Sequence, residues 1–167
     1  MVSANKLTKK RRKHTPSTPW HPMFIDLMTE YGPNHIDIAS EVVVSRAALL
    51  SDAVIAKRKD KSTIEPTVLR HMWTWLNEIM VLELKTHSRP IRKGELSKLV
   101  GYCMLYHALH REEISHIQQM CGAMVVAQVN DVLFDEIKSI GLKLQPESQG
   151  YFRLVGPSSI RLYLVVL

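Results

Sequence analysis

The residues best suited to chemistry are Cys103, His107 and His110, which are spaced by four and three positions. On a helix this spacing places all three on one face, and thiolate and imidazole are ligands that zinc prefers. Cys103, however, is in register with Leu96 and Leu99 on an apolar stripe, where a small buried thiol is ordinary packing. The sequence contains no Cys-x-x-Cys pair. We therefore expect no cofactor, and these three residues are only a weak zinc candidate.

Other catalytic patterns are missing from the sequence. Its seven glycines form no Gly-x-Gly pair, which argues against a dinucleotide fingerprint or phosphate loop of the usual form. No serine occupies a Gly-x-Ser-x-Gly elbow. The paired carboxylates at 112–113 and 135–136 are direct neighbours, so on a helix they point in different directions and do not form an acid–base pair. We predict a protein without enzymatic activity.

Positive charge is concentrated at the start of the chain. The formal net charge is +6, from 22 basic and 16 acidic side chains, and the first 25 residues hold six of the basic ones and no acid. A polar, proline-broken segment buries too little apolar surface to fold alone, so we expect a disordered arm over 1–22 and one domain over 23–167. Such an arm binds polyanions by counterion release, binds an acidic membrane surface, or is recognised by a nuclear import receptor. Its basic residues are Lys6, Lys9, Lys10, Arg11, Arg12 and Lys13.

Two further basic clusters flank the segment 66–85. A neutral body with charge gathered on one side suits the binding of a polyanion, although solvated loops would carry the same residues. The first cluster is Lys57, Arg58, Lys59 and Lys61, and the second is Arg89, Arg92, Lys93 and Lys98; all of these except Lys98 are candidate nucleic-acid-binding or membrane-binding residues.

Hydrophobic spacing predicts the elements that position these residues. We expect helices over 22–31, 66–85, 93–110 and 131–140, and extended segments over 35–44, 123–129, 142–144, 151–155 and 160–167. Residues 46–56 fit either a helix or an extended edge, and 112–121 could form another helix. The predicted fold class is α+β, with helices packed on a small antiparallel sheet and a C-terminal β-hairpin.

Two features predict self-association. Trp73 and Trp75 are two positions apart, so on one helix they face opposite sides, and one is left for an interface unless the domain buries both. The chain also ends in an apolar run that would form a strand with an edge in need of a partner. We predict a homo-oligomer assembled through Trp73, Leu164 and Leu167.

The order of these features resembles the matrix proteins of rhabdoviruses, in particular the compact plant-infecting members. The likeness rests on the basic arm with its prolines, on Arg89–Ile91 leading into an apolar helix, on the run 133–144 and on Tyr151–Leu154. The arm has no Pro-Pro-x-Tyr motif. The resemblance implies a non-enzymatic virion protein that self-associates, condenses nucleoprotein–RNA and links it to a membrane in the host cell, at the membrane periphery, in the cytoplasm or in the nucleus.

Two other interpretations fit the same sequence. Helices followed by a hairpin are also the order of a winged helix, a nucleic-acid-binding regulator whose wing would be 146–150. The neutral residues at 145 and 149 weaken this interpretation, because a wing that reaches phosphates normally carries lysine or arginine. A cellular adaptor whose exposed tryptophan docks a partner helix is the third interpretation.

Overall fold

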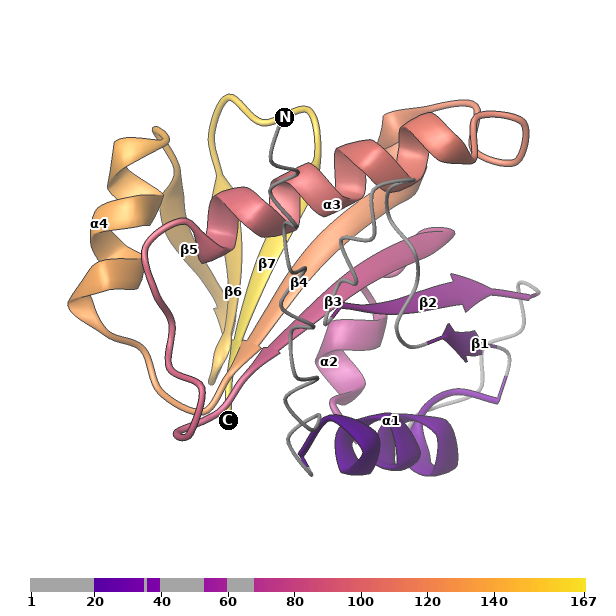
Figure 1. Cartoon of the computed structure of the whole chain (residues 1–167), viewed down its shortest axis with the longest axis horizontal. Coiled ribbons are helices and arrows are strands. Elements are labelled where there is room, and N and C mark those ends of the chain that lie inside the picture. Colours follow the sequence, from indigo (N-terminus) through magenta and orange to yellow (C-terminus); the bar gives the residue numbers. More distant parts are fainter. Residues whose placement is uncertain (1–19, 35, 40–52, 60–67) are drawn as a thin grey trace, which may run out of the picture.

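The computed structural model describes residues 20–34, 36–39, 53–59 and 68–167 (Figure 1). Residues 1–19 of the predicted arm, and Lys61, lie outside the described residues, whereas the last three residues of the predicted arm, 20–22, begin helix α1. In chain order the elements are α1 (Trp20–Tyr31), β1 (Ile36–Ala39), β2 (Val54–Arg58), α2 (Arg70–Trp73), β3 (Ile79–Lys85), α3 (Glu95–Leu109), the 3-10 turn η1 (Ile117–Gln119), β4 (Met120–Val126), α4 (Asp131–Ser139), β5 (Lys143–Ser148), β6 (Tyr151–Val155) and β7 (Arg161–Val166).

The strands form one seven-stranded sheet in the order β1-β2-β3-β4-β7-β6-β5. Strand β4 is parallel to both of its neighbours, β3 and β7. The other four pairs of strands are antiparallel. The predicted α+β class and the C-terminal hairpin are confirmed. The sheet is larger than the small antiparallel one that we expected, because the chain returns through α3 to place β4 parallel to β3.

Helices cover both faces of the sheet (Figure 1). On one face α3 and α4 pack over the strands, and the core there includes Ile79 and Val81 of β3. On the other face α1 and α2 pack, and the core includes Met80 and Leu82. Consecutive residues of β3 therefore enter different cores, as expected for a central strand that is covered on both sides.

The predicted helix over 66–85 is wrong. Within the described part of this segment only α2, four residues long, is helical, and strand β3 follows it. A strand buried on both faces is apolar at nearly every position, so the run Ile79–Leu82 also matches a helical stripe. The further helix considered over 112–121 is also wrong, since this stretch contains η1 and the start of β4.

The other predicted helices are confirmed. The stripe over 93–110 forms α3, and the segment over 22–31 lies within α1. Helix α4 begins where the sequence predicts it, because the side chain of Asn130 accepts a hydrogen bond from the amide of Leu133. Gly141, with φ of +75°, follows its last turn.

The predictions of an exposed tryptophan and of a C-terminal strand with a free edge are both wrong. Trp73 and Trp75 are 5% and 6% exposed, because α2 is a single turn and the chain then folds both rings against the same sheet. The Trp73 ring N–H donates to the carbonyl of Val68, and Trp75 stacks on Tyr163 with centroids 4.2 Å apart. Strand β7 lies between β4 and β6, so both of its edges are paired and Leu164 is buried. Of the three residues predicted to mediate self-association, Leu167 alone is exposed.

Two glycines provide a matched test of this packing. A Cβ added at Gly122 of β4 would lie 3.0 Å from Leu162 and 3.1 Å from the Cys103 sulfur, whereas one added at Gly101 of α3 meets nothing within 4 Å. We expect Gly122→Ala to lower the free energy of unfolding by about 1–3 kcal/mol through overpacking. Gly101→Ala should raise it by about 0.5–1 kcal/mol, because alanine favours the helix. Urea denaturation measures both, and a Gly122→Ala variant as stable as the unmodified chain would contradict the packing.

Candidate functional site

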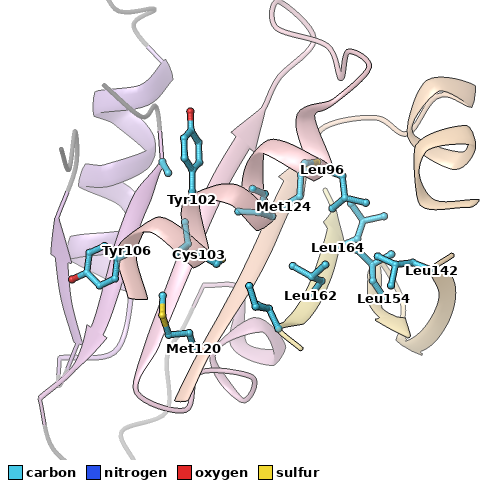
Figure 2. Close-up of a cluster of buried hydrophobic side chains, with 14 of the residues drawn as sticks. Leu96, Tyr102, Cys103, Tyr106, Met120, Met124, Leu142, Leu154, Leu162 and Leu164 are labelled. Carbon is cyan, nitrogen blue, oxygen red and sulfur yellow. The ribbon is translucent and has the colours of Figure 1, made fainter. Parts of the chain in front are cut away.

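The predicted zinc candidate is not assembled. Cys103 is fully buried on the inner face of α3, above β4 (Figure 2), and its sulfur lies against Gly122, where an added Cβ would be 3.1 Å away. The ring of His110 instead stacks on Tyr106, with centroids 4.2 Å apart. Among the residues that the structure describes, no group of three or more histidine, cysteine or acidic side chains is placed to hold a metal ion by itself.

The first predicted basic cluster is largely paired within the chain. Lys57 forms an ion pair with Glu113 at 2.5 Å, which raises the pKa of the lysine, and Lys59 pairs with Asp37. Arg58 donates to the carbonyl of Leu76 at 2.5 Å. These contacts leave this cluster less free positive charge than its composition indicates.

The second predicted cluster lies far from the first. Arg92 and Lys93 are exposed immediately before α3, and Arg89 is partly buried in the same loop. Glu113, the partner of Lys57, follows the other end of α3, a helix of 15 residues. At 1.5 Å per residue the helix separates the two clusters by roughly 22 Å. The structure therefore does not bring them together into one patch.

A different set of charged residues is brought together where β3 ends and α3 begins. The ammonium of Lys85 lies 2.7 Å from Oε1 of Glu83 and 2.6 Å from Oε2 of Glu95. Lys98 completes the set, with its ammonium 3.8 Å from each of the same two carboxylates. We call Glu83, Lys85, Glu95 and Lys98 the buried charge cluster.

Burial makes this cluster unusual. The side chain of Glu83 is 1% exposed and that of Lys85 is 9% exposed. Oε2 of Glu83 is buried and accepts no hydrogen bond. A buried carboxylate oxygen without a donor costs free energy of folding, and buried ion pairs rarely repay their own desolvation. We therefore expect the cluster to contribute little to the stability of the fold. It is a candidate site for a ligand that contacts Oε2 of Glu83.

Lys98 is the most exposed member of the cluster, with its side chain 38% exposed. Burial disfavours the charged form of Lys98, but the carboxylate of Glu83 and the neighbouring Tyr102 more than compensate and raise the pKa of its ammonium. The ammonium also lies over the ring of Tyr102, 5.2 Å from the centroid. Lys98 therefore stays protonated at neutral pH and offers a positive charge at the exposed edge of the cluster.

The fold explains why these four residues meet. Glu83 and Lys85 lie at the C-terminal end of β3. Because side chains alternate along a strand, they share the face of Ile79 and Val81, which lies under α3. Glu95 and Lys98 lie one helical turn apart at the start of α3. The carboxyl ends of parallel strands are where sheets of this kind bind ligands, because the chain turns there into helix N-termini.

The sequence analysis missed this cluster. Within a helix over 66–85, Glu83 and Lys85 would have been ordinary residues of a solvated face. The available signal was the apolar run Ile79–Leu82 followed directly by Glu-x-Lys, which on a strand places two opposite charges on the same face.

Comparisons with known proteins identify no relative: no family model, no curated protein and no solved structure matches this chain. In the described part of the chain no helix is both long and apolar enough to cross a membrane.

The two thiols provide a test of the site assignment. Burial raises the pKa of Cys103 far above its ordinary value and that of Cys121 to about 12, and both side chains are fully buried. Since the thiolate is the reactive form, we expect Ellman's reagent to label neither cysteine in the native protein and both after unfolding in guanidinium. Rapid labelling of Cys103 in the native protein would contradict its placement in the core.

Proposed function

We propose that this protein is a metal-dependent hydrolase of phosphodiester bonds in nucleic acid, with the buried charge cluster as its active centre. The observation that carries the proposal is the carboxylate of Glu83, which is buried beside two lysines with one oxygen unpartnered. The proposal departs from the sequence-based expectation of a protein without enzymatic activity, which stays an untested prediction.

The donor set of the cluster suits a hard divalent cation such as Mg²⁺. Mg²⁺ in phosphoryl-transfer sites is held by one or two carboxylates, with waters and substrate phosphate completing its shell, so a site of three protein ligands is not required. Glu83 and Glu95 would be the ligands, and the free Oε2 of Glu83 is the atom that now lacks a partner. When bound, such a cation polarises a phosphoryl oxygen and lowers the pKa of its water.

The two lysines have different tasks in this proposal. Lys85 bridges both carboxylates and so limits their mutual repulsion when no cation is present. Lys98 is partly exposed and protonated, so it is placed to meet the charge of an incoming phosphate and to stabilise the charge that develops on it.

The charge of the N-terminal segment supports a polymeric substrate. Its six basic residues carry all of the formal net charge of +6, which suits a nucleic acid better than a small phosphate ester. The expected polyanion partner is thus retained here as a substrate.

The matrix-like interpretation, with self-association, nucleoprotein–RNA condensation and membrane attachment, stays a prediction. Its self-association surface is the part that needs revision, since Trp73 and Leu164 are buried and β7 is an interior strand. The winged-helix alternative meets a different obstacle. Glu147 in the hairpin accepts a hydrogen bond from the Trp75 ring N–H at 2.6 Å, so the predicted wing packs back onto the domain.

Substitution of Glu83 tests the proposed centre. We expect the purified full chain to cleave plasmid DNA or single-stranded RNA with Mg²⁺ or Mn²⁺, and Glu83→Gln to lower the rate at least about 100-fold. Glutamine keeps the shape and removes the charge. Lys98→Met should also lower the rate strongly, whereas Lys138→Met, at an exposed position in the last turn of α4, should leave it unchanged.

The same variants control for folding and contamination. Circular dichroism establishes that each is folded at the assay temperature, and parallel purification exposes any copurifying nuclease. Equal cleavage by the unmodified chain and Glu83→Gln, or no metal-dependent cleavage of either substrate, would overturn the proposal.

Deletion of residues 1–19, which removes all six basic residues and leaves α1 intact, tests the source of substrate affinity. If six basic residues contact phosphates, the log–log salt slope of duplex binding should become less steep by up to about 5. Fluorescence anisotropy at several salt concentrations measures this slope. We expect the melting temperature to change little, and binding that is undiminished by the deletion would assign the affinity to the body instead.

A further inference from the structure

The first turn of α3 has an unusual cap. Its N-cap residue is Gly94, with φ of +90° and no side chain, so the helix begins without a local acceptor for its free amides. The carboxylate of Glu136 in α4, about 40 positions further along the chain, takes this place instead.

Glu136 contacts this turn through both oxygens. Oε1 accepts hydrogen bonds from the amide and hydroxyl of Ser97 at 2.9 and 2.8 Å, and Oε2 accepts from the amides of Gly94 and Leu96 at 3.1 and 3.4 Å. The Glu136 side chain is 6% exposed. A buried carboxylate that accepts four hydrogen bonds at the positive end of a helix is a strong and directional contact.

The same turn carries two members of the buried charge cluster. Glu95 lies between the Gly94 and Leu96 amides that Glu136 holds, and Lys98 follows Ser97 directly. The two cluster residues on β3 belong to the rigid centre of the sheet. The distance between the two halves of the cluster therefore depends on where the first turn of α3 is fixed.

We propose that Glu136 is a positioning residue, which holds the first turn of α3 so that Glu95 and Lys98 face Glu83 and Lys85 in the arrangement that binds the cation. This inference rests on the proposed function. It adds that α4, which contributes no group to the cluster, controls the metal affinity of the site. Outer contacts of this kind typically change metal affinity or activity 10–100-fold when they are removed.

The test measures two properties of the full chain without an activity assay. Amide hydrogen exchange of residues 95–98 in the metal-free protein reports how firmly the turn is held. Titration with Mn²⁺, followed by calorimetry or by paramagnetic broadening, reports the metal affinity. The variants are Glu136→Ala, Glu136→Gln and Asp135→Asn, which removes a charge of the same sign from the exposed neighbouring position.

We expect Glu136→Ala to speed exchange in the first turn of α3 and to weaken Mn²⁺ binding by about tenfold or more. Glu136→Gln keeps one acceptor oxygen for one pair of donors, so its exchange rate and Mn²⁺ affinity should lie between those of the unmodified chain and Glu136→Ala. This variant preserves the test if the alanine variant does not fold. Asp135→Asn should stay within about twofold of the unmodified chain, because it changes charge but not the cap.

Two outcomes would overturn the inference in distinguishable ways. Folded Glu136 variants with loosened amides and unchanged Mn²⁺ affinity would make the contact purely structural. An unmodified chain that binds no Mn²⁺ would overturn the proposed function, and with it this role for Glu136, before any variant is compared.

Discussion

The parallel pairing of β3 with β4 through α3 is the constraint on which the rest of the molecule depends. It places β3 in the interior of the sheet, with β2 on one side and β4 on the other, and with helices over both faces. A strand in this position is buried on both faces, so any charged side chain on it is removed from water. Glu83 and Lys85 are therefore desolvated by the same pairing that buries Val81 and Leu82. The pairing also fixes where the start of α3 must lie, because the helix has to cross back over the sheet to begin β4.

The energetic consequence is a core that carries opposite charges at the end of one strand. Taking two ions out of water is costly, and their attraction repays the cost only when every lone pair is satisfied. Here the ammonium of Lys85 is shared between two carboxylates, and Oε2 of Glu83 has no donor. Apolar residues of similar volume would fill the same space without this penalty. In the proposed function, the bound cation would supply the partner that Oε2 of Glu83 lacks.

The sequence predicts the parts of this fold that depend on local pattern. Helices α3 and α4 have clear apolar stripes, and the Asn130 cap and Gly141 stop mark the ends of α4 without reference to other segments. The hairpin of β5 and β6 is similarly local. Strand β3 was missed because its pairing partner β4 lies beyond α3, and because a strand buried on both faces loses the alternation that distinguishes it from a helix.

The failure at β3 also explains why the candidate site was missed. Glu83 and Lys85 acquire their meaning only from burial, and burial was hidden by the wrong period assigned to 66–85. The zinc candidate is not assembled because the apolar stripe of α3 was predicted correctly: Cys103 belongs to that stripe and is buried in the core. The predicted exposure of one tryptophan depended on a helix that continues through both, whereas α2 ends at Trp73.

The two halves of the sheet contribute unequally to the proposed centre. Strand β3 and the first turn of α3 supply its four residues, whereas the segment after β4 contributes α4 and the strands β5, β6 and β7. Leu133 and Ile137 of α4 pack into the same core as Leu142 and Leu154, so the helix is anchored on the C-terminal strands. Through Glu136 it then bears on the first turn of α3. The C-terminal half is thus joined to the first turn of α3 by the buried carboxylate of Glu136 and by the core that α3 shares with Leu154 and Leu162.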